Sequence, residues 1–169
     1  MINTILLTFI SCLTLFCFIF LGIGKFGLLP SYSAYSSKWN EAVPISNMNL
    51  WSIVTLVAAV LLIPVLLEIS ADSPIQFLGF FTPIYLICVS FTPNWQNDDK
   101  EYKYHVIFAL LCAICAFLYI GLILNRWGCI LGSLIIILTI SILSKTLKTH
   151  LVFWLEMIMF LSMYLSLII

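Results

Sequence analysis

The chain has 169 residues, of which 63% are hydrophobic and only 8% are charged, and its formal net charge is zero. A water-soluble domain carries about 25% charged residues, so this composition excludes an ordinary water-exposed surface and makes the lipid bilayer the expected environment. The sequence has no basic tract, which argues against nucleic acid as a partner.

Six stretches are apolar enough to be membrane-spanning helices, each of which needs about 20 residues. They cover approximately residues 4–24, 50–70, 75–92, 104–124, 128–144 and 150–169. Short loops join them, and no segment remains for a soluble domain. The predicted fold is therefore all-α, a polytopic integral membrane protein with six transmembrane helices in one bundle, forming a single domain over residues 1–169.

The first stretch, 4–24, carries small and polar residues at helical spacing: Thr4, Thr8, Ser11 and Cys12. Such a face suits close packing on a neighbouring helix in lipid. No Lys or Arg precedes the stretch and no A-x-A-like site follows it, so we expect a retained span and not a cleaved signal peptide.

Two polar loops follow, at about 25–49 and 93–105, and their lysines predict the orientation. The loops on one side of the membrane hold Lys25, Lys38, Lys100, Lys103, Lys145 and Lys148, whereas the other side holds Arg126 alone. The positive-inside rule places the lysine-bearing loops in the cytoplasm. We therefore expect a multi-pass protein of the cell membrane with both termini on the non-cytoplasmic side.

His105 stands at the head of the fourth predicted span. The residues on its helical face are small: Ala109, Cys112, Ala113 and Ala116. Faces of this kind pack inward, so His105 should point into the bundle. Glu101 lies one turn earlier, where a carboxylate would orient the imidazole as a base or a metal ligand. Alternatively, Asp98 and Glu101 only start the helix, and His105 bonds a backbone carbonyl.

Glu156 is the second candidate, because it lies about 9 Å inside the last predicted span at 1.5 Å per residue. A carboxylate inside a membrane helix costs about 2.5–3.5 kcal/mol on insertion scales, and such residues are functional suspects. The structural alternatives are that Lys148 or Lys25 reaches down to pair with it, or that the carboxyl group stays protonated.

Two short motifs between about residues 27 and 120 support a resemblance. They are P-S-x-S-A-x-Y, carried by Pro30, Ser31, Ser33 and Ala34, and E-x-x-x-H, carried by Glu101 and His105. In both, the chain resembles uncharacterised small six-helix multi-pass membrane proteins of gut bacteria and their mobile elements, although Ser36 and Ser37 follow Tyr35 where that pattern has a second aromatic residue. The resemblance implies a six-helix bundle and a common site for Ser31, Ser33, Glu101 and His105, and it implies no reaction.

The first functional hypothesis is a polar pocket at one membrane face that binds or transports a small solute or a lipid headgroup. Its binding candidates are Ser31, Ser33, Glu101 and His105, with Glu156 as an intramembrane charge. The lipid bilayer and such a ligand are the expected partners. The sequence assigns neither a catalytic residue nor a cofactor.

Two alternatives remain open. A metal-assisted membrane lipid hydrolase would use His105 and His150 as metal ligands, and it loosely resembles the ceramidase and adiponectin-receptor type of multi-pass lipid hydrolase, without the paired histidines of that type. A structural or accessory subunit would pack on a second copy or on another membrane protein through Gly128 and Gly132, whose spacing lets helices approach closely.

Overall fold

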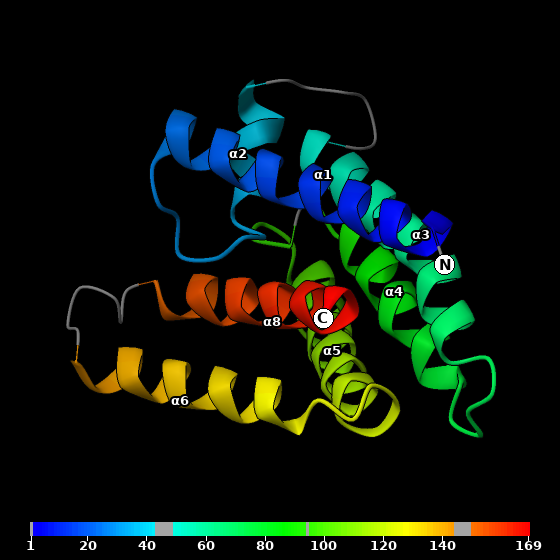
Figure 1. The fold of residues 1–169 in the computed structure, drawn as a ribbon. Helices are drawn as coiled ribbons and strands as arrows, with labels where there is room; N and C mark the ends of the chain where they lie inside the picture. The colour runs from blue at the N-terminus through cyan, green and yellow to red at the C-terminus, as the bar shows by residue number, and fades with distance from the viewer. Residues whose placement is uncertain (1, 43–48, 94, 144–149) are drawn as a thin grey trace.

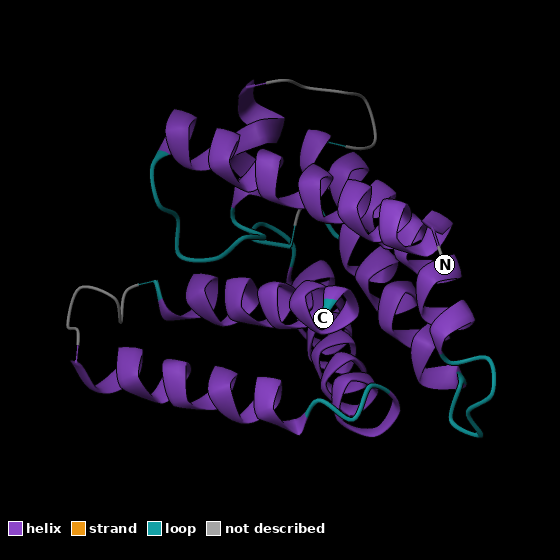
Figure 2. Cartoon of the chain, in the orientation of Figure 1, coloured by secondary structure: helices purple, strands orange, loops and turns teal. Residues whose placement is uncertain are grey.

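The computed structural model describes residues 2–42, 49–93, 95–143 and 150–169 (Figure 1). Every regular element within these ranges is a helix (Figure 2), which confirms the all-α prediction. The elements are α1 (Ile2–Phe26), α2 (Tyr35–Ala42), α3 (Leu50–Ile69), α4 (Phe77–Ser90), α5 (Asp99–Leu118), the π-helical turn η1 (Tyr119–Ile123), α6 (Trp127–Leu143) and α8 (Leu151–Ile168). Lys145 and Lys148, on which part of the predicted orientation rests, lie outside the described residues.

Four of the described helices are long and apolar enough to cross a membrane: Asn3–Phe26, Leu50–Ile69, Asp99–Ile123 and Leu151–Ile168. The helices α4 and α6 have 14 and 17 residues. At 1.5 Å per residue these are about 21 Å and 26 Å long, shorter than the roughly 30 Å hydrocarbon core. All six predicted stretches are thus helical, and the length criterion selects four of them as candidate spans.

The helices form two groups that meet at α8 (Figure 1). In the first group, α1 packs on α3, α3 on α4, and α4 on α5. In the second group, α8 packs on α6, and it also contacts α1 and α5. In Figure 1, α8 lies between α1 and α6, so this helix joins the two groups.

Three of the four residues on the predicted packing face of α1 are buried, and Cys12 is partly exposed. Thr4, Thr8 and Ser11 are all inaccessible or nearly so. The Ser11 hydroxyl lies 2.8 Å from the carbonyl oxygen of Ala58 in α3 and 2.7 Å from the hydroxyl of Tyr164 in α8. These hydrogen bonds join three helices within an otherwise apolar core.

The short helix α2 lies in the segment that the sequence predicts as a loop. Its first residue, Tyr35, is fully buried, and the phenol donates to the carbonyl oxygen of Gly27 over 2.8 Å. Gly27 follows α1 with a φ of 74°, and its N–H donates to Ile23, as expected of a glycine that ends a helix. A methyl group at Gly22 would lie 2.9 Å from the Tyr35 ring, so glycine allows α2 to pack on α1.

The helix α5 begins at Asp99, five residues before the predicted start of the fourth span at 104. The Asp98 carboxylate accepts the N–H groups of Lys100 and Glu101 at 2.7 and 3.2 Å, which is the arrangement of an N-cap. The charged residues therefore form the first turn of the helix, ahead of the apolar run at 104 where the predicted span begins.

Candidate functional site

A cavity of about 340 Å³ lies among α3, α4, α5, α6, α8 and the segment that precedes α2. Its lining is Tyr32, Ser33, Trp51, Leu86, Val89, His105, Ala109, Cys112, Ala113, Phe117, Leu134, Ile137, Leu155, Glu156, Met159 and Phe160. The predicted inward face of α5 is confirmed, since His105, Ala109, Cys112 and Ala113 all belong to this lining.

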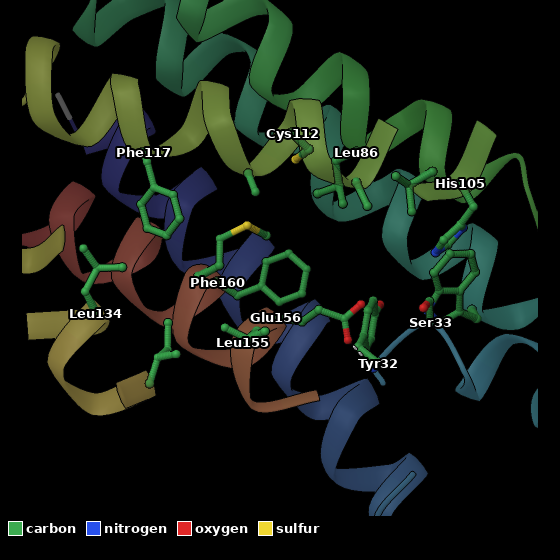
Figure 3. Close-up of a pocket in the computed structure, with 16 residues that line it drawn as sticks. Tyr32, Ser33, Leu86, His105, Cys112, Phe117, Leu134, Leu155, Glu156 and Phe160 are labelled. Atoms are coloured by element: carbon green, nitrogen blue, oxygen red, sulfur yellow. Dashed lines mark hydrogen bonds between the residues drawn. The ribbon is translucent and has the colours of Figure 1, made fainter. Parts of the chain in front are cut away.

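The cavity has a polar end and an apolar end (Figure 3). His105, Ser33, Tyr32 and Glu156 gather on one side of the view, and Phe117 and Leu134 lie on the other. The His105 and Ser33 side chains are both 4% exposed, whereas Leu134 is 51% exposed. The polar end is therefore closed within the protein, and the apolar end reaches the outer surface beside α6.

The polar end is built where the segment 27–34 runs along the start of α8. The N–H of Phe153, in the first turn of α8, donates to the carbonyl oxygen of Pro30 over 2.9 Å. Nδ1 of His150 lies 3.1 Å from the carbonyl oxygen of Leu29. The loop carbonyls thus accept hydrogen bonds from groups at the N-terminus of α8, where the backbone N–H groups have no partner within the helix.

Glu156 joins the same two segments through a hydrogen bond whose donor lies in the loop and whose acceptor lies in α8. Its carboxylate oxygen Oε2 accepts the backbone N–H of Tyr32 over 2.6 Å (Figure 3). The backbone and the side chain of Ser33 also interact with this carboxyl group. Ser31 contributes its hydroxyl, which accepts the N–H of Ala34 at 3.0 Å. Glu156 and Ser31 together cap the turn that leads into α2.

Tyr32 forms one wall of the polar end. Its hydroxyl lies 2.8 Å from the Thr55 hydroxyl, and its ring packs on those of Trp51 and Phe160 with centroid distances of 5.7 and 5.6 Å. Burial raises the pKa of the Tyr32 phenol well above its usual range, so this hydroxyl is neutral at physiological pH and can donate a hydrogen bond.

His105 is held by an aromatic stack and by one hydroxyl. The Trp95 ring lies 4.8 Å from the imidazole at an interplanar angle of 15°, and the Trp51 ring lies 6.2 Å away at 37°. Nδ1 lies 2.8 Å from Oγ1 of Thr92. The Thr92 hydroxyl donates its single proton to the carbonyl oxygen of Val89 over 2.7 Å. We therefore assign the proton of His105 to Nδ1, which leaves Nε2 as a hydrogen-bond acceptor.

Trp51 has an unusual polar group for a cavity wall. Its side chain is fully buried, and within the described part of the chain its indole Nε1 has no hydrogen-bond partner. Buried polar groups are nearly always paired in folded proteins, and an exception calls for an explanation.

The structure brings three of the five binding candidates into one cavity: Ser33, His105 and Glu156. Ser31 lies directly behind them, because its hydroxyl is 3.2 Å from the Ser33 hydroxyl. Glu101 is in the first turn of α5 and is absent from the cavity lining. Asp98 starts the helix, as the structural alternative expects, but His105 bonds the Thr92 hydroxyl and not a backbone carbonyl.

Of the two candidate lysine partners of Glu156, Lys25 is described and lies elsewhere. Nζ of Lys25 lies over the ring of Trp39, 4.7 Å from its centroid, and Lys148 falls outside the described residues. The acceptor capacity of Glu156 is instead used by backbone and hydroxyl groups of the segment 31–34.

The two remaining alternatives receive no support from the described contacts. His150 contacts Leu29 and is absent from the cavity lining that includes His105. In the described ranges, no group of three or more His, Cys, Asp or Glu side chains is placed to hold a metal ion. A methyl group added at Gly128 or Gly132 would meet nothing within 4 Å, so the close helix packing expected of these glycines is not made within the described chain.

Sequence reasoning missed Trp51, Trp95, Thr92 and the direct part played by Tyr32. A usable signal was present for Trp95, which precedes the helix of the candidate histidine by a few residues. Comparisons with protein-family models, with curated proteins and with solved structures find no match for this chain.

Proposed function

We propose that this chain is a multi-pass membrane protein that binds a small amphiphilic molecule, either a lipid or a solute with a polar head, in the cavity between α5, α6 and α8. The observation that carries the proposal is the division of that cavity into a closed polar end at His105 and Glu156 and an open apolar end at Leu134. Ligand pockets are mostly apolar, with a few polar groups that fix orientation.

The position of the open end supports entry from the lipid. Leu134 and Leu155 are both on the outer surface as well as in the cavity lining. The outer surface of α6 is apolar along its described length, with exposed Leu131, Ile135 and Leu138. In a bilayer this face would meet acyl chains, and a ligand dissolved in the membrane would reach the cavity without crossing water.

The proposal includes the orientation and the number of crossings. We infer six crossings, because α4 and α6 are apolar helices connected in series with the four longer ones, and local thinning of the bilayer or tilting of neighbours can accommodate short spans. The lysine distribution favours a cytoplasmic position for the loops that hold Lys25 and Lys100, which would place the polar end of the cavity near the cytoplasmic face.

Two cysteines of α5 allow a direct test. Cys112 lines the cavity, whereas Cys115, one turn further on, does not. Two variants would keep either one and have alanine at the other five cysteine positions. Each would be purified in polymer-bounded nanodiscs and treated with methyl methanethiosulfonate, with and without single-chain probes of ten carbons that carry hydroxyl, carboxylate, phosphate or ammonium heads. At least one probe should slow modification of Cys112 several-fold and leave the rate at Cys115 unchanged.

A second measurement covers the case in which Cys112 reacts too slowly to follow. Ala113→Phe places a ring in the cavity, and Leu110→Phe places the same ring on the exposed face of α5. The probes should raise the melting temperature of Leu110→Phe as they do that of the wild type, and should fail to do so for Ala113→Phe. The proposal would be wrong if no probe protected Cys112 and none stabilised the wild-type protein.

A further inference from the structure

The charge of the cavity wall restricts the head of the ligand. Among the described residues that line the cavity, Glu156 is the only carboxylic acid, and neither Lys nor Arg is present. Glu156 is also partly accessible, whereas Ser33 and His105 at the same end are each 4% exposed and Tyr32 is 2% exposed. Of the polar residues at the closed end, Glu156 therefore offers the most surface to a ligand.

The chain itself uses most, but not all, of the hydrogen-bonding capacity of Glu156. Oε2 accepts the backbone N–H of Tyr32 over 2.6 Å, and the backbone and hydroxyl groups of Ser33 also bond the carboxyl group. A carboxylate has about four acceptor positions, so three donors leave about one position for a group that the ligand brings. All three donors are neutral, and none of them supplies a positive charge.

The described chain also supplies no cation at this place. Nζ of Lys25 lies over the ring of Trp39, and the imidazole of His105 is hydrogen-bonded to Thr92. A carboxylate removed from water is unfavourable without a cationic partner, and carboxylates inside membrane helices serve as partners of other charges or as counter-ions of ligands. The cavity therefore favours a positively charged head beside Glu156 over a negatively charged one.

We propose that the ligand is a cationic amphiphile, a single-chain molecule with a protonated amine as its head, and that Glu156 is its counter-ion. The ammonium group donates to the remaining acceptor position of the carboxylate. The chain extends past Cys112 toward Leu134, through the apolar part of the lining (Figure 3). The volume of about 340 Å³ lies at the small end of the range for ligand pockets, which favours one chain over two. This inference rests on the proposed function, because it names the class of ligand for the same cavity.

The test compares four probes with the same chain of ten carbons: decylammonium, decanol, decanoate and decyl phosphate. The protein is the variant that keeps only Cys112, in nanodiscs of zwitterionic lipid, and the readout is the probe concentration that halves the rate of Cys112 modification. Each concentration is corrected for partition of the same probe into empty nanodiscs. Decylammonium should act at a concentration at least about tenfold lower than each other probe, as expected for a hydrogen bond to a charged group. An uncharged or anionic probe that acts at the same or a lower concentration would overturn the inference.

A pair of matched variants tests the assignment to Glu156. Glu156→Gln removes the charge and keeps a carbonyl oxygen, and its control is Glu101→Gln, one turn before His105 and outside the cavity lining. The advantage of decylammonium over decanol should fall below about threefold in Glu156→Gln and stay at about tenfold or more in Glu101→Gln. Equal losses in both variants would show attraction by the general charge of this end of the bundle, and would contradict the role of Glu156.

The outcomes separate this inference from the proposed function. If decanol or an anionic probe protects Cys112 best, the proposed function stands and this inference fails. If no probe protects Cys112 or stabilises the protein, both fail. Should Glu156→Gln be too unstable to purify, the comparison of the four probes decides alone, because it needs no change at Glu156.

Discussion

The backbone N–H of Tyr32 donates to the carboxylate of Glu156 over 2.6 Å, although 124 residues separate them in the chain. The same two segments are joined in the other direction, because the N–H of Phe153 donates to the carbonyl oxygen of Pro30. Each segment thus caps the other, in the manner of a capping box divided between two distant parts of the chain. Glu156 has a structural role here in addition to its place in the cavity wall.

Two substitutions of Glu156 should separate the contribution of its hydrogen bond to stability from the contribution of its charge. Glu156→Ala leaves the buried Tyr32 N–H without an acceptor and should lower the free energy of unfolding by about 1–3 kcal/mol. Glu156→Gln keeps a carbonyl oxygen at the same position, so it should lose less than half of that amount. Denaturant unfolding in nanodiscs measures both changes. Equal losses for the two variants would show that the charge, and not the hydrogen bond, is what matters.

The hydrogen bond between Ser11 and Tyr164 should couple α1 to α8. The two hydroxyls lie 2.7 Å apart and are buried. A double-mutant cycle with Ser11→Ala and Tyr164→Phe should give a coupling of about 0.6 kcal/mol, the average for interhelical hydrogen bonds in membranes. Thr139→Val is the control, because the Thr139 hydroxyl bonds only its own helix on an exposed face. A cycle energy of zero would contradict the contact.

Gly79 should be the glycine least tolerant of substitution in the described bundle. A methyl group there would lie 2.8 Å from the Ser70 hydroxyl oxygen and 3.0 Å from the backbone oxygen of Leu66, where α4 crosses α3. Gly79→Ala should therefore lower stability by about 1–3 kcal/mol through overpacking. Gly132→Ala, where a methyl group meets nothing within 4 Å, should be neutral or stabilising. Thermal melting of the two variants distinguishes these outcomes.

The number of crossings can be tested at two loops. If α4 crosses the membrane, a cysteine at Ser73 and a cysteine at Asp99 lie on opposite sides, because these residues precede and follow that helix. In sealed vesicles a membrane-impermeant maleimide should label one of them and not the other, on a background that lacks the native cysteines. Labelling of both from the same side would show that α4 does not cross.

The inward direction of His105 was predictable because small residues at helical spacing, Ala109 and Cys112 among them, mark a packed face. The involvement of Glu156 was predictable from the cost of placing a carboxylate in lipid. The partner of Glu156 was not predictable, because Tyr32 contributes its backbone N–H. Almost every residue type has this group, so the residue type does not identify the donor.

Other features depend on contacts between distant segments. The predicted pairing of His105 with Glu101 depended on their spacing along one helix. In the structure the imidazole is hydrogen-bonded to Thr92, which lies beyond the end of α4. The helix α2 was missed because its polar composition matches a loop. Burial of Tyr35 and Trp39 against α1 is what stabilises it, and that depends on the tertiary fold.

The reciprocal caps between the segment 30–32 and α8 have a consequence for biogenesis. The ribosome synthesises the segment 30–32 well over a hundred residues before Glu156. During synthesis the Tyr32 N–H therefore has no Glu156 carboxylate to bond until α8 has emerged from the translation machinery. The turn before α2 and the closed end of the cavity can reach their final form only then. Nascent chains stalled ahead of residue 150 should therefore remain sensitive to proteases near residue 32, and chains released after α8 should become resistant.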